Sequence, residues 1–238
     1  MIALPPAKEA LDRRFDTVRH QLQQACAAAG RPPVTLLAVS KGHPASAIRA
    51  VAGRGQQAFG ENYLQPALDK MAELQDLPLQ WHYIGAIQSN KTRAIAEHFD
   101  WVQTVDRLKI ARRLSEQRPP SLPPLQVLLQ VNIDEEPQKA GATAAELPAL
   151  AAAVLQLPRL TLRGIMGLPA ATQDDTQRRA SLARLNQLFR QLQPLSASID
   201  TLSMGMSDDL ALAIAEGSTM VRIGTALFGP RPTTDDDH

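Results

Sequence analysis

The stretch TLLAVSK at residues 35–41 decides the fold class of this chain. A helical period precedes it and stops at Gly30 and the Pro32-Pro33 pair, since glycine and proline interrupt helices. Its short apolar centre then predicts a buried strand that ends on a lysine. A further helical segment, ASAIRAVAGR, follows. The order of helix, buried strand and helix predicts an α/β protein.

The same alternation returns along the chain. Strands are predicted at TLLAVSK (35–41), QAFGEN (57–62), WHYIGAI (81–87), WVQTV (101–105), LQVLLQVNI (125–133), LTLRGIMGL (160–168), IDTLSMG (199–205) and MVRIGTALF (220–228). Strands that are apolar on both faces and separated by helices indicate a parallel sheet covered by helices. Eight such units favour a single (β/α)8 TIM barrel, with an open doubly wound sheet as the alternative.

The length fits one domain. With 238 residues, 44% of them hydrophobic, the chain can bury a sizeable core and is near the size of one closed barrel, so we expect a single domain over residues 1–238. An amphipathic pattern at about residues 7–29 predicts an extra helix within residues 1–30. The tail at residues 231–238, with three consecutive aspartates, is expected to be disordered.

Composition excludes several function classes. The formal net charge is +1 and no dense basic run is present, so we expect neither nucleic acid nor an acidic membrane as a partner. Cys26 is the single cysteine, which excludes a disulfide framework and a cysteine-based metal site. No apolar run approaches the roughly 18 residues of a membrane helix. We therefore expect a cytoplasmic protein without a metal and, because no interface pattern stands out, a monomer.

Lys41 is the first candidate site residue. It ends a predicted barrel strand, and barrel active sites are built at the carboxyl ends of the strands. Leu37, Val39 and Lys41 share one strand face, which directs the lysine along the barrel interior toward the mouth. Desolvation there lowers the pKa of the amine and frees its lone pair to attack an aldehyde. A lysine that reaches water or pairs with a carboxylate is the alternative.

The ends of the last two predicted strands carry residues suited to an anion. Ser207, followed by Asp208 and Asp209, looks like a helix N-cap, and the small residues around Gly205 allow backbone amides to approach a phosphate. Gly224 and Thr225 offer an unobstructed N–H and a hydroxyl. A cap or a turn explains each segment alone, but their joint place after strands seven and eight predicts a phosphate cup.

Arg222 should also face the interior, because it lies two residues before Gly224. A buried ion pair is one explanation. If a phosphate lies at Gly224 and Thr225 and an aldehyde at Lys41, a pyridine ring spans the gap and its nitrogen can accept from Arg222. A guanidinium loses its proton only above about pH 12, so it donates without protonating the ring. Carbanion chemistry is then less favoured.

Three further polar clusters fall at the same mouth or its wall: Glu61-Asn62, His82 and QSNK (88–91). Asn62 is the best candidate among them to contact a ring substituent. His82 is equally consistent with a hydrogen-bonded wall residue and with a functional one.

Several motifs resemble those of the pyridoxal phosphate homeostasis proteins, also known as proline synthetase co-transcribed homologues. They are AVSKGHPASAI (38–48), FGENY (59–63), WHYIGAIQSNK (81–91), DTLSMGMSDD (200–209) and GSTMVRIGTALFG (217–229). The resemblance covers residues 34–230, and several motifs in the same order make an accidental match improbable. It implies a single-domain barrel of the alanine racemase type, which is a fold type III pyridoxal 5′-phosphate (PLP) protein.

The resemblance also implies roles for individual residues. It implies a Schiff base between PLP and Lys41, phosphate contacts from Ser203, Ser207, Gly224 and Thr225, and Arg222 at the ring nitrogen. The implied function is a non-catalytic carrier and buffer of this vitamin B6 cofactor. It takes up PLP reversibly in the cell and passes it to PLP-dependent apoenzymes.

Three positions depart from the family pattern. Gly42-His43 stands where many members have Thr-Lys, residues 138–141 read QKAG in place of a more usual SKSG, and Gly167 replaces Ala or Thr. No proposed ligand is lost. His43 could alter transfer of the cofactor, and the loop at residues 138–141 lacks hydroxyls that its role would use.

Two other functions remain open. A PLP-dependent amino-acid racemase needs a base on each face of the substrate carbanion, so Lys41 would require an opposing partner. The racemases that this barrel resembles supply a tyrosine from a second, all-β domain. Tyr63 and Tyr83, the two tyrosines here, lack that context, and no such domain is expected after the eighth strand. A barrel that binds another phosphorylated metabolite without covalent attachment is the third hypothesis.

Overall fold

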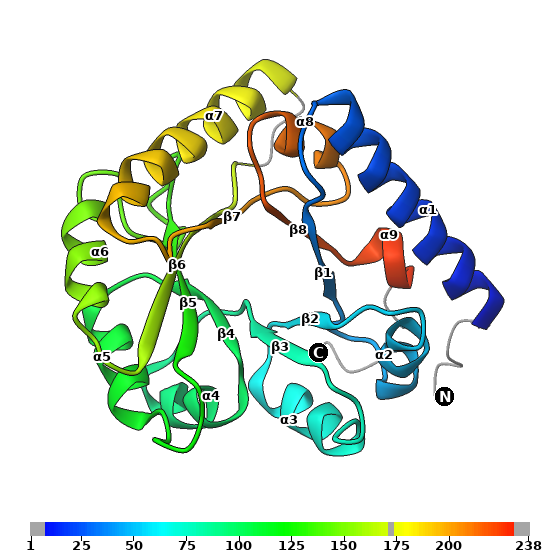
Figure 1. Ribbon diagram of the computed structural model, residues 1–238, viewed down its shortest axis with the longest axis horizontal. Coiled ribbons are helices and arrows are strands. Elements are labelled where there is room, and N and C mark those ends of the chain that lie inside the picture. Colours follow the sequence, from blue (N-terminus) through cyan, green and yellow to red (C-terminus); the bar gives the residue numbers. More distant parts are fainter. Residues whose placement is uncertain (1–7, 171–173, 231–238) are drawn as a thin grey trace.

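The computed structural model describes residues 8–170 and 174–230, which form a closed barrel of parallel strands surrounded by helices (Figure 1). Each strand pairs with the next along the chain, and the last pairs with the first. The strands are β1 (Thr35–Val39), β2 (Ala58–Glu61), β3 (Gln80–Tyr83), β4 (Trp101–Val105), β5 (Leu125–Val131), β6 (Leu160–Gly167), β7 (Thr201–Ser203) and β8 (Met220–Ile223). The predicted (β/α)8 barrel is confirmed, and closure rules out the open sheet.

The helices lie on the outer face of the barrel (Figure 1). They are α1 (Lys8–Ala28), α2 (Ala45–Ala52), α3 (Leu64–Glu73), α4 (Thr92–His98), α5 (Leu108–Gln117), α6 (Leu147–Leu155), α7 (Asp175–Leu192), α8 (Leu210–Ala215) and α9 (Thr225–Phe228), with short 3₁₀ turns η1 (Ser89–Lys91) and η2 (Gln193–Leu195). Within the described ranges, no helix combines the length and apolar character needed to cross a bilayer.

The extra N-terminal helix is present as α1. Its buried residues recur every three or four positions, at Leu11, Phe15, Val18, Leu22 and Cys26, which is the spacing of one apolar helix face. That face packs against α2, α8 and α9 on the flank of the barrel (Figure 1). The tail at residues 231–238, predicted to be disordered, lies outside the described residues.

Several strands are shorter than their apolar runs predicted. The strand predicted over residues 220–228 ends at Ile223, and residues 225–228 form α9. The apolar run continues past the strand because Leu227 and Phe228 of α9 are buried in the outer core. Apolar residues at these positions therefore indicate burial, which a helix and a strand share. Likewise β3 ends at Tyr83, and the following Ile84 packs against the barrel interior.

The barrel interior is only partly apolar. One small cluster forms around Leu37 and Met220, and another around Trp101 and Met166. Buried polar side chains fill space between them: His82, Gln103, Ser203 and Arg222. Polar groups in such a place need internal hydrogen-bond partners, so this part of the interior is where a functional arrangement is expected.

Gly164 lies where the backbones of β6 and β7 approach each other closely, so a substitution there tests that contact. Its φ is +141°, and an added Cβ would lie 2.0 Å from the carbonyl oxygen of Thr201. We expect Gly164→Ala to lower the free energy of unfolding by about 3 kcal/mol, because strain and a backbone clash coincide. Urea denaturation measures the effect.

Gly53 supplies the control, since its φ is −61° and its Cβ would meet nothing closer than 3.4 Å. Gly53→Ala should shift the free energy of unfolding by less than about 1 kcal/mol. Equal losses in the two variants would contradict this account of the β6–β7 contact.

Candidate binding site at the barrel mouth

A cavity of about 490 Å³ opens at the carboxyl ends of the strands. Its lining comes from the ends of β1, β2, β3, β6, β7 and β8 and from the segments that follow them: Val39, Lys41, Asn62, Ile84, Met166, Leu168, Met206, Ser207, Asp208, Arg222, Gly224 and Thr225. Six of the seven predicted site residues are in this lining. The structure therefore brings together positions predicted from four separate segments of the chain.

Lys41 lies in the turn after β1, half-buried at the edge of the cavity. Leu37 faces the barrel interior and Val39 lines the cavity, in agreement with the predicted common face. Ser40, which immediately precedes the lysine, has its backbone N–H bonded to the carbonyl of Gly60 at 3.0 Å. The strand end that carries Lys41 is therefore fixed to its neighbour β2.

A buried ion pair behind the cavity holds the same turn. Lys70 Nζ of α3 lies 2.7 Å from Glu61 Oε1, with side chains 11% and 1% exposed. Lys70 also donates to the carbonyl of Ser40 at 3.0 Å, and the Ser40 hydroxyl donates to Glu61 Oε1 at 2.6 Å. Glu61 was predicted at the mouth or its wall; its carboxylate bonds Lys70 of α3 on the outer side of the sheet and the hydroxyl of Ser40, the residue before Lys41.

The segment after β7 takes a tight turn around Gly205. This glycine has a φ of +97°, and an added Cβ would meet Ala213 Cβ at 2.5 Å. Asp209 Oδ1 accepts from the backbone N–H of Met206 at 2.6 Å. The turn brings Ser207 to the cavity lining, where its hydroxyl is exposed.

The prediction that Ser207 caps the following helix is wrong. Helix α8 begins at Leu210 and Asp209 is the residue that precedes it. Because Asp209 closes the turn onto Met206, the backbone becomes helical two residues later than the sequence pattern indicated. Ser207 is thereby left in the turn, as part of the cavity lining.

Arg222 on β8 forms the deeper wall of the cavity. Its side chain is buried, with Nη1 donating to Ser203 Oγ at 2.7 Å and Nη2 donating to the carbonyl of Gly167 at 3.0 Å. Burial lowers the pKa of Arg222 to about 10, and the charge of Asp209 opposes that shift. The guanidinium is still protonated at neutral pH. Its bonding partners are neutral groups, so the structure does not show the ion pair considered from the sequence.

Ser203 lies beneath the cavity and not in its lining. It is fully buried and donates to Gln103 Oε1 at 2.8 Å while accepting from Arg222. The phosphate contact that the resemblance implies for Ser203 stays a prediction. Its position favours a different role, in which its hydroxyl oxygen accepts a hydrogen bond from Arg222 and fixes that side chain.

His82 is a hydrogen-bonded residue of the barrel wall. Its ring stacks on Trp101 with centroids 5.0 Å apart, and its nitrogens contact Gln80 at 3.2 Å and Gln103 at 3.0 Å. Burial lowers the pKa of His82 to about 3, so the imidazole is neutral at physiological pH. Gln103 is a residue that the sequence analysis missed. Only its place opposite His82 and Ser203 in the closed barrel distinguishes it.

Asn62 follows β2 and lines the cavity. Its backbone is fixed by close packing on Gly85, where an added Cβ would lie 2.0 Å from the Asn62 carbonyl oxygen. Its side-chain Oδ1 is buried and has no hydrogen-bond partner among the described residues. A buried acceptor at the edge of a cavity marks a place for a ligand donor.

Two departures from the family pattern lie outside the cavity lining. His43 is buried, and its ring stacks on Phe228 with centroids 5.0 Å apart. At Gly167 an added Cβ would meet the Leu185 side chain at 2.5 Å, so a larger residue there requires Leu185 to move. The effect of His43 on transfer stays a prediction, and any such effect would be indirect.

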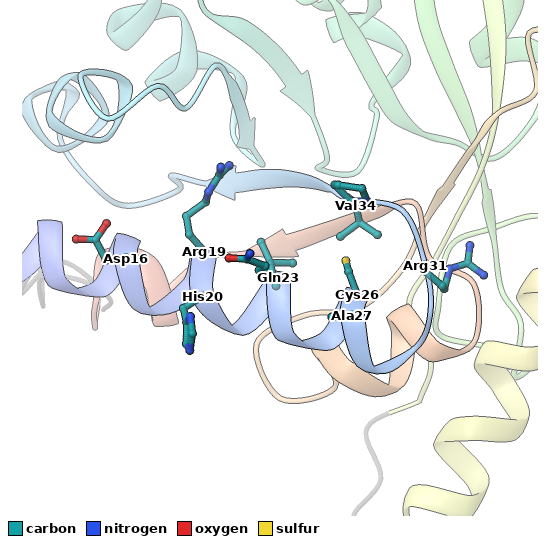
Figure 2. Close-up of a pocket in the computed structure, with 10 residues that line it drawn as sticks. Asp16, Arg19, His20, Gln23, Cys26, Ala27, Arg31 and Val34 are labelled. Carbon is teal, nitrogen blue, oxygen red and sulfur yellow. The ribbon is translucent and has the colours of Figure 1, made fainter.

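A second hollow, of about 680 Å³, runs along α1 (Figure 2). It contains none of the predicted site residues. Figure 2 shows Arg19, His20 and Arg31 pointing in different directions, so these side chains do not converge on one ligand. Within the described ranges, no group of three metal-ligating side chains occurs either. The barrel mouth is therefore the better candidate site.

Comparison with curated proteins decides the family. The chain is 60% identical over 216 residues to the pyridoxal phosphate homeostasis protein of Pseudomonas aeruginosa, covering 90% of this chain and 93% of that protein. Identity to the Escherichia coli K12 protein of the same name is 52% over 219 residues, covering 90% and 94%. This chain belongs to the pyridoxal phosphate homeostasis protein family. The resemblance stated from the sequence motifs is thereby confirmed.

Family models and solved structures agree. Residues 14–232 match the model of the alanine racemase N-terminal domain. PipY of Synechococcus elongatus PCC7942, solved with PLP bound, is 40% identical, with a TM-score of 0.78 and coverage of 92% of this chain and 100% of that chain. Alanine racemase from Corynebacterium glutamicum is 18% identical, with a TM-score of 0.67 and coverage of 96% of this chain and 64% of that chain. This last likeness shows the fold alone.

The ion pair behind Lys41 can be tested by removing one partner. Lys70→Met leaves the Glu61 carboxylate buried without its cation, so we expect the free energy of unfolding to fall by about 3–5 kcal/mol. Chemical denaturation of both proteins measures the difference.

The matched control is the pair between Arg49 Nη1 and Asp76 Oδ2, which are 2.6 Å apart with side chains 46% and 58% exposed. Arg49→Met should have a far smaller effect, because water screens an exposed pair. Comparable losses in Lys70→Met and Arg49→Met would refute the importance assigned to the buried pair.

Proposed function

We propose that this chain binds pyridoxal 5′-phosphate covalently through Lys41 and acts in intracellular homeostasis of that cofactor. The observation that carries the proposal is one cavity lined by an amine, a buried guanidinium and the hydroxyl and glycine positions Ser207, Gly224 and Thr225. The names of the relatives and the PLP-bound structure of PipY support it.

The residues of the cavity fit this cofactor. About 490 Å³ lies within the range of small-molecule sites, about 300–1,000 Å³. Lys41 would hold the aldehyde, Arg222 the ring nitrogen, and Ser207, Gly224 and Thr225 the phosphate. Asn62 Oδ1, buried without a partner among the described residues, supplies an acceptor for a ring substituent. Each polar part of the cofactor thus has a matching group in the lining.

When bound, PLP supplies an aldehyde carbon for attachment and an electron-accepting ring. The protein's own groups would limit how strongly that ring accepts electrons. Arg222 is a hydrogen-bond donor that keeps its proton at neutral pH, because its pKa is about 10 even when buried. It therefore holds an acceptor in place without giving it a proton. This arrangement favours binding over carbanion chemistry.

A carrier fits the lining better than a racemase does. Lys41, Asp208 and Arg222 are the ionisable side chains of the described lining. Tyr83 donates its hydroxyl to the Ala86 carbonyl at 3.2 Å, and Tyr63 is 62% exposed; neither contributes to the lining. No tyrosine within residues 8–170 and 174–230 therefore opposes Lys41 across the cavity. We assign this chain a non-catalytic role.

The wider role follows from reversible attachment. A protein that holds PLP through one amine can release it to PLP-dependent apoenzymes and limit the free aldehyde in the cytoplasm. We propose that it does so as a monomer and as a single domain, since every lining residue comes from the one barrel.

Absorption spectroscopy tests the attachment. Protein reconstituted with PLP should show a band near the roughly 420 nm of a protonated imine, fixed by borohydride and missing in Lys41→Ala. Lys91→Ala is the control, because Lys91 lies in η1 and outside the cavity lining. Identical spectra for wild type and Lys41→Ala would refute covalent binding at Lys41. Tight binding of PLP without the band would favour the phosphorylated-metabolite barrel.

The non-catalytic assignment predicts little racemisation of amino acids. PLP-loaded protein incubated with L-alanine should form D-alanine no faster than free PLP does, because inversion needs a base on each face of the α carbon and no tyrosine of the described lining faces Lys41. Chiral chromatography measures the D-alanine. Formation of D-alanine at enzymatic rates that is lost in Lys41→Ala would instead establish the racemase.

A further inference from the structure

A chain of buried hydrogen bonds runs from the cavity wall into the barrel. Arg222 Nη1 meets Ser203 Oγ at 2.7 Å, and Ser203 Oγ meets Gln103 Oε1 at 2.8 Å. Gln103 Nε2 then meets His82 Nδ1 at 3.0 Å. His82 Nε2 ends the chain on Gln80 Oε1 at 3.2 Å. The chain links β8, β7, β4 and β3. Its members Arg222, Ser203, Gln103 and His82 are almost wholly shielded from water, and Gln80 at its end is exposed.

Chemistry fixes the direction of every bond in this chain. A guanidinium has no acceptor, so Arg222 must donate and Ser203 Oγ must accept. The single hydroxyl hydrogen of Ser203 is then given to Gln103, whose oxygen accepts it. The Gln103 amide nitrogen therefore faces His82 Nδ1, which accepts, and the imidazole carries its proton on Nε2 toward Gln80.

Met220 reinforces this orientation of the Gln103 amide. Its sulfur lies 3.2 Å from Gln103 Nε2, and a thioether is only a weak acceptor. Rotating the amide by 180° would place its oxygen against that sulfur. It would also leave the Ser203 hydroxyl hydrogen facing a second donor. One amide, which both donates and accepts, thus determines the orientation of the whole chain.

Gln103 determines whether the Ser203 hydroxyl turns a lone pair or its hydrogen toward Arg222. With its hydrogen held by Gln103, Ser203 turns a lone pair toward Nη1, while the Gly167 carbonyl accepts from Nη2. Two acceptors on two different nitrogens fix the plane of the guanidinium. Polarisation along such a chain strengthens each bond in a low-dielectric interior.

We propose that Gln103 is a positioning residue for ligand recognition: acting through Ser203, it orients the Arg222 guanidinium so that the cavity selects a ligand with a neutral ring nitrogen. The inference rests on the proposed function and deepens it, because it assigns part of the selectivity for PLP to a side chain outside the cavity lining. Gln103 does not touch the ligand.

The test compares PLP with its 1-deaza analogue, in which a C–H replaces the ring nitrogen and cannot accept from Arg222. Equilibrium titration gives the ratio of the two dissociation constants for each protein. In Gln103→Met, which keeps the side-chain length but removes the amide, the preference for PLP should fall by a factor of about five, the effect of one hydrogen bond. Ser203→Ala should reduce the preference similarly.

Gln56→Met is the matched control. Gln56 is also buried and donates to the carbonyls of Leu36 and Ala58 at 2.7 Å, but it has no link to Arg222. Its loss should lower stability and leave the preference for PLP unchanged. The same preference in wild type, Gln103→Met and Ser203→Ala would overturn the inference, with the proposed function intact. Wild type that binds neither ligand would overturn both.

A measurement on the ligand-free protein tests the orientation directly. In ¹⁵N-labelled wild type at neutral pH, NMR of the imidazole nitrogens should show His82 neutral with its proton on Nε2. His82→Phe assigns the signals. A neutral ring with the proton on Nδ1, or a charged ring, would require the opposite amide orientation at Gln103 and would overturn the inference even if Gln103→Met failed to fold.

Discussion

The site depends on the pairing of β8 with β1 that closes the barrel. In that pairing Leu37 is the register partner of Arg222, and Ala38 is the partner of Ile223. Both strands end at the same rim, so Lys41 and Gly224, which are far apart in sequence, line one cavity. Opening the barrel between these two strands would leave β1 and β8 at opposite edges of a sheet and separate Lys41 from Gly224.

Closure also places a cation in the interior, which the protein must stabilise. Arg222 is buried, and an uncompensated guanidinium there would be strongly destabilising. The structure meets this need with the Ser203 hydroxyl and the Gly167 carbonyl, both neutral. Because no carboxylate binds Arg222 in those contacts, its positive charge stays available to the cavity. The hydrogen bonds that stabilise the fold therefore also prepare the site for its ligand.

Sequence patterns predicted on which face of a strand a residue lies, but they did not predict its hydrogen-bond or ion-pair partners. Strand periodicity placed Lys41 and Arg222 on the interior face, because alternation along a strand does not depend on what lies opposite. No such pattern pairs Glu61 with Lys70 or Gln103 with His82, since those contacts join different elements. The start of α8 was mispredicted because Asp209 bonds the Met206 amide, and a tertiary turn thus replaced a local cap.

Peptide mapping tests the central claim most directly. The chain has six lysines, of which Lys41 alone lies in the described cavity lining. Protein loaded with PLP at one equivalent, reduced with borohydride and digested should carry the reduced adduct on the peptide that contains Lys41. Mass spectrometry of the intact protein should show a single adduct. Label spread over several lysines, or concentrated on another lysine, would contradict a dedicated site at the barrel mouth.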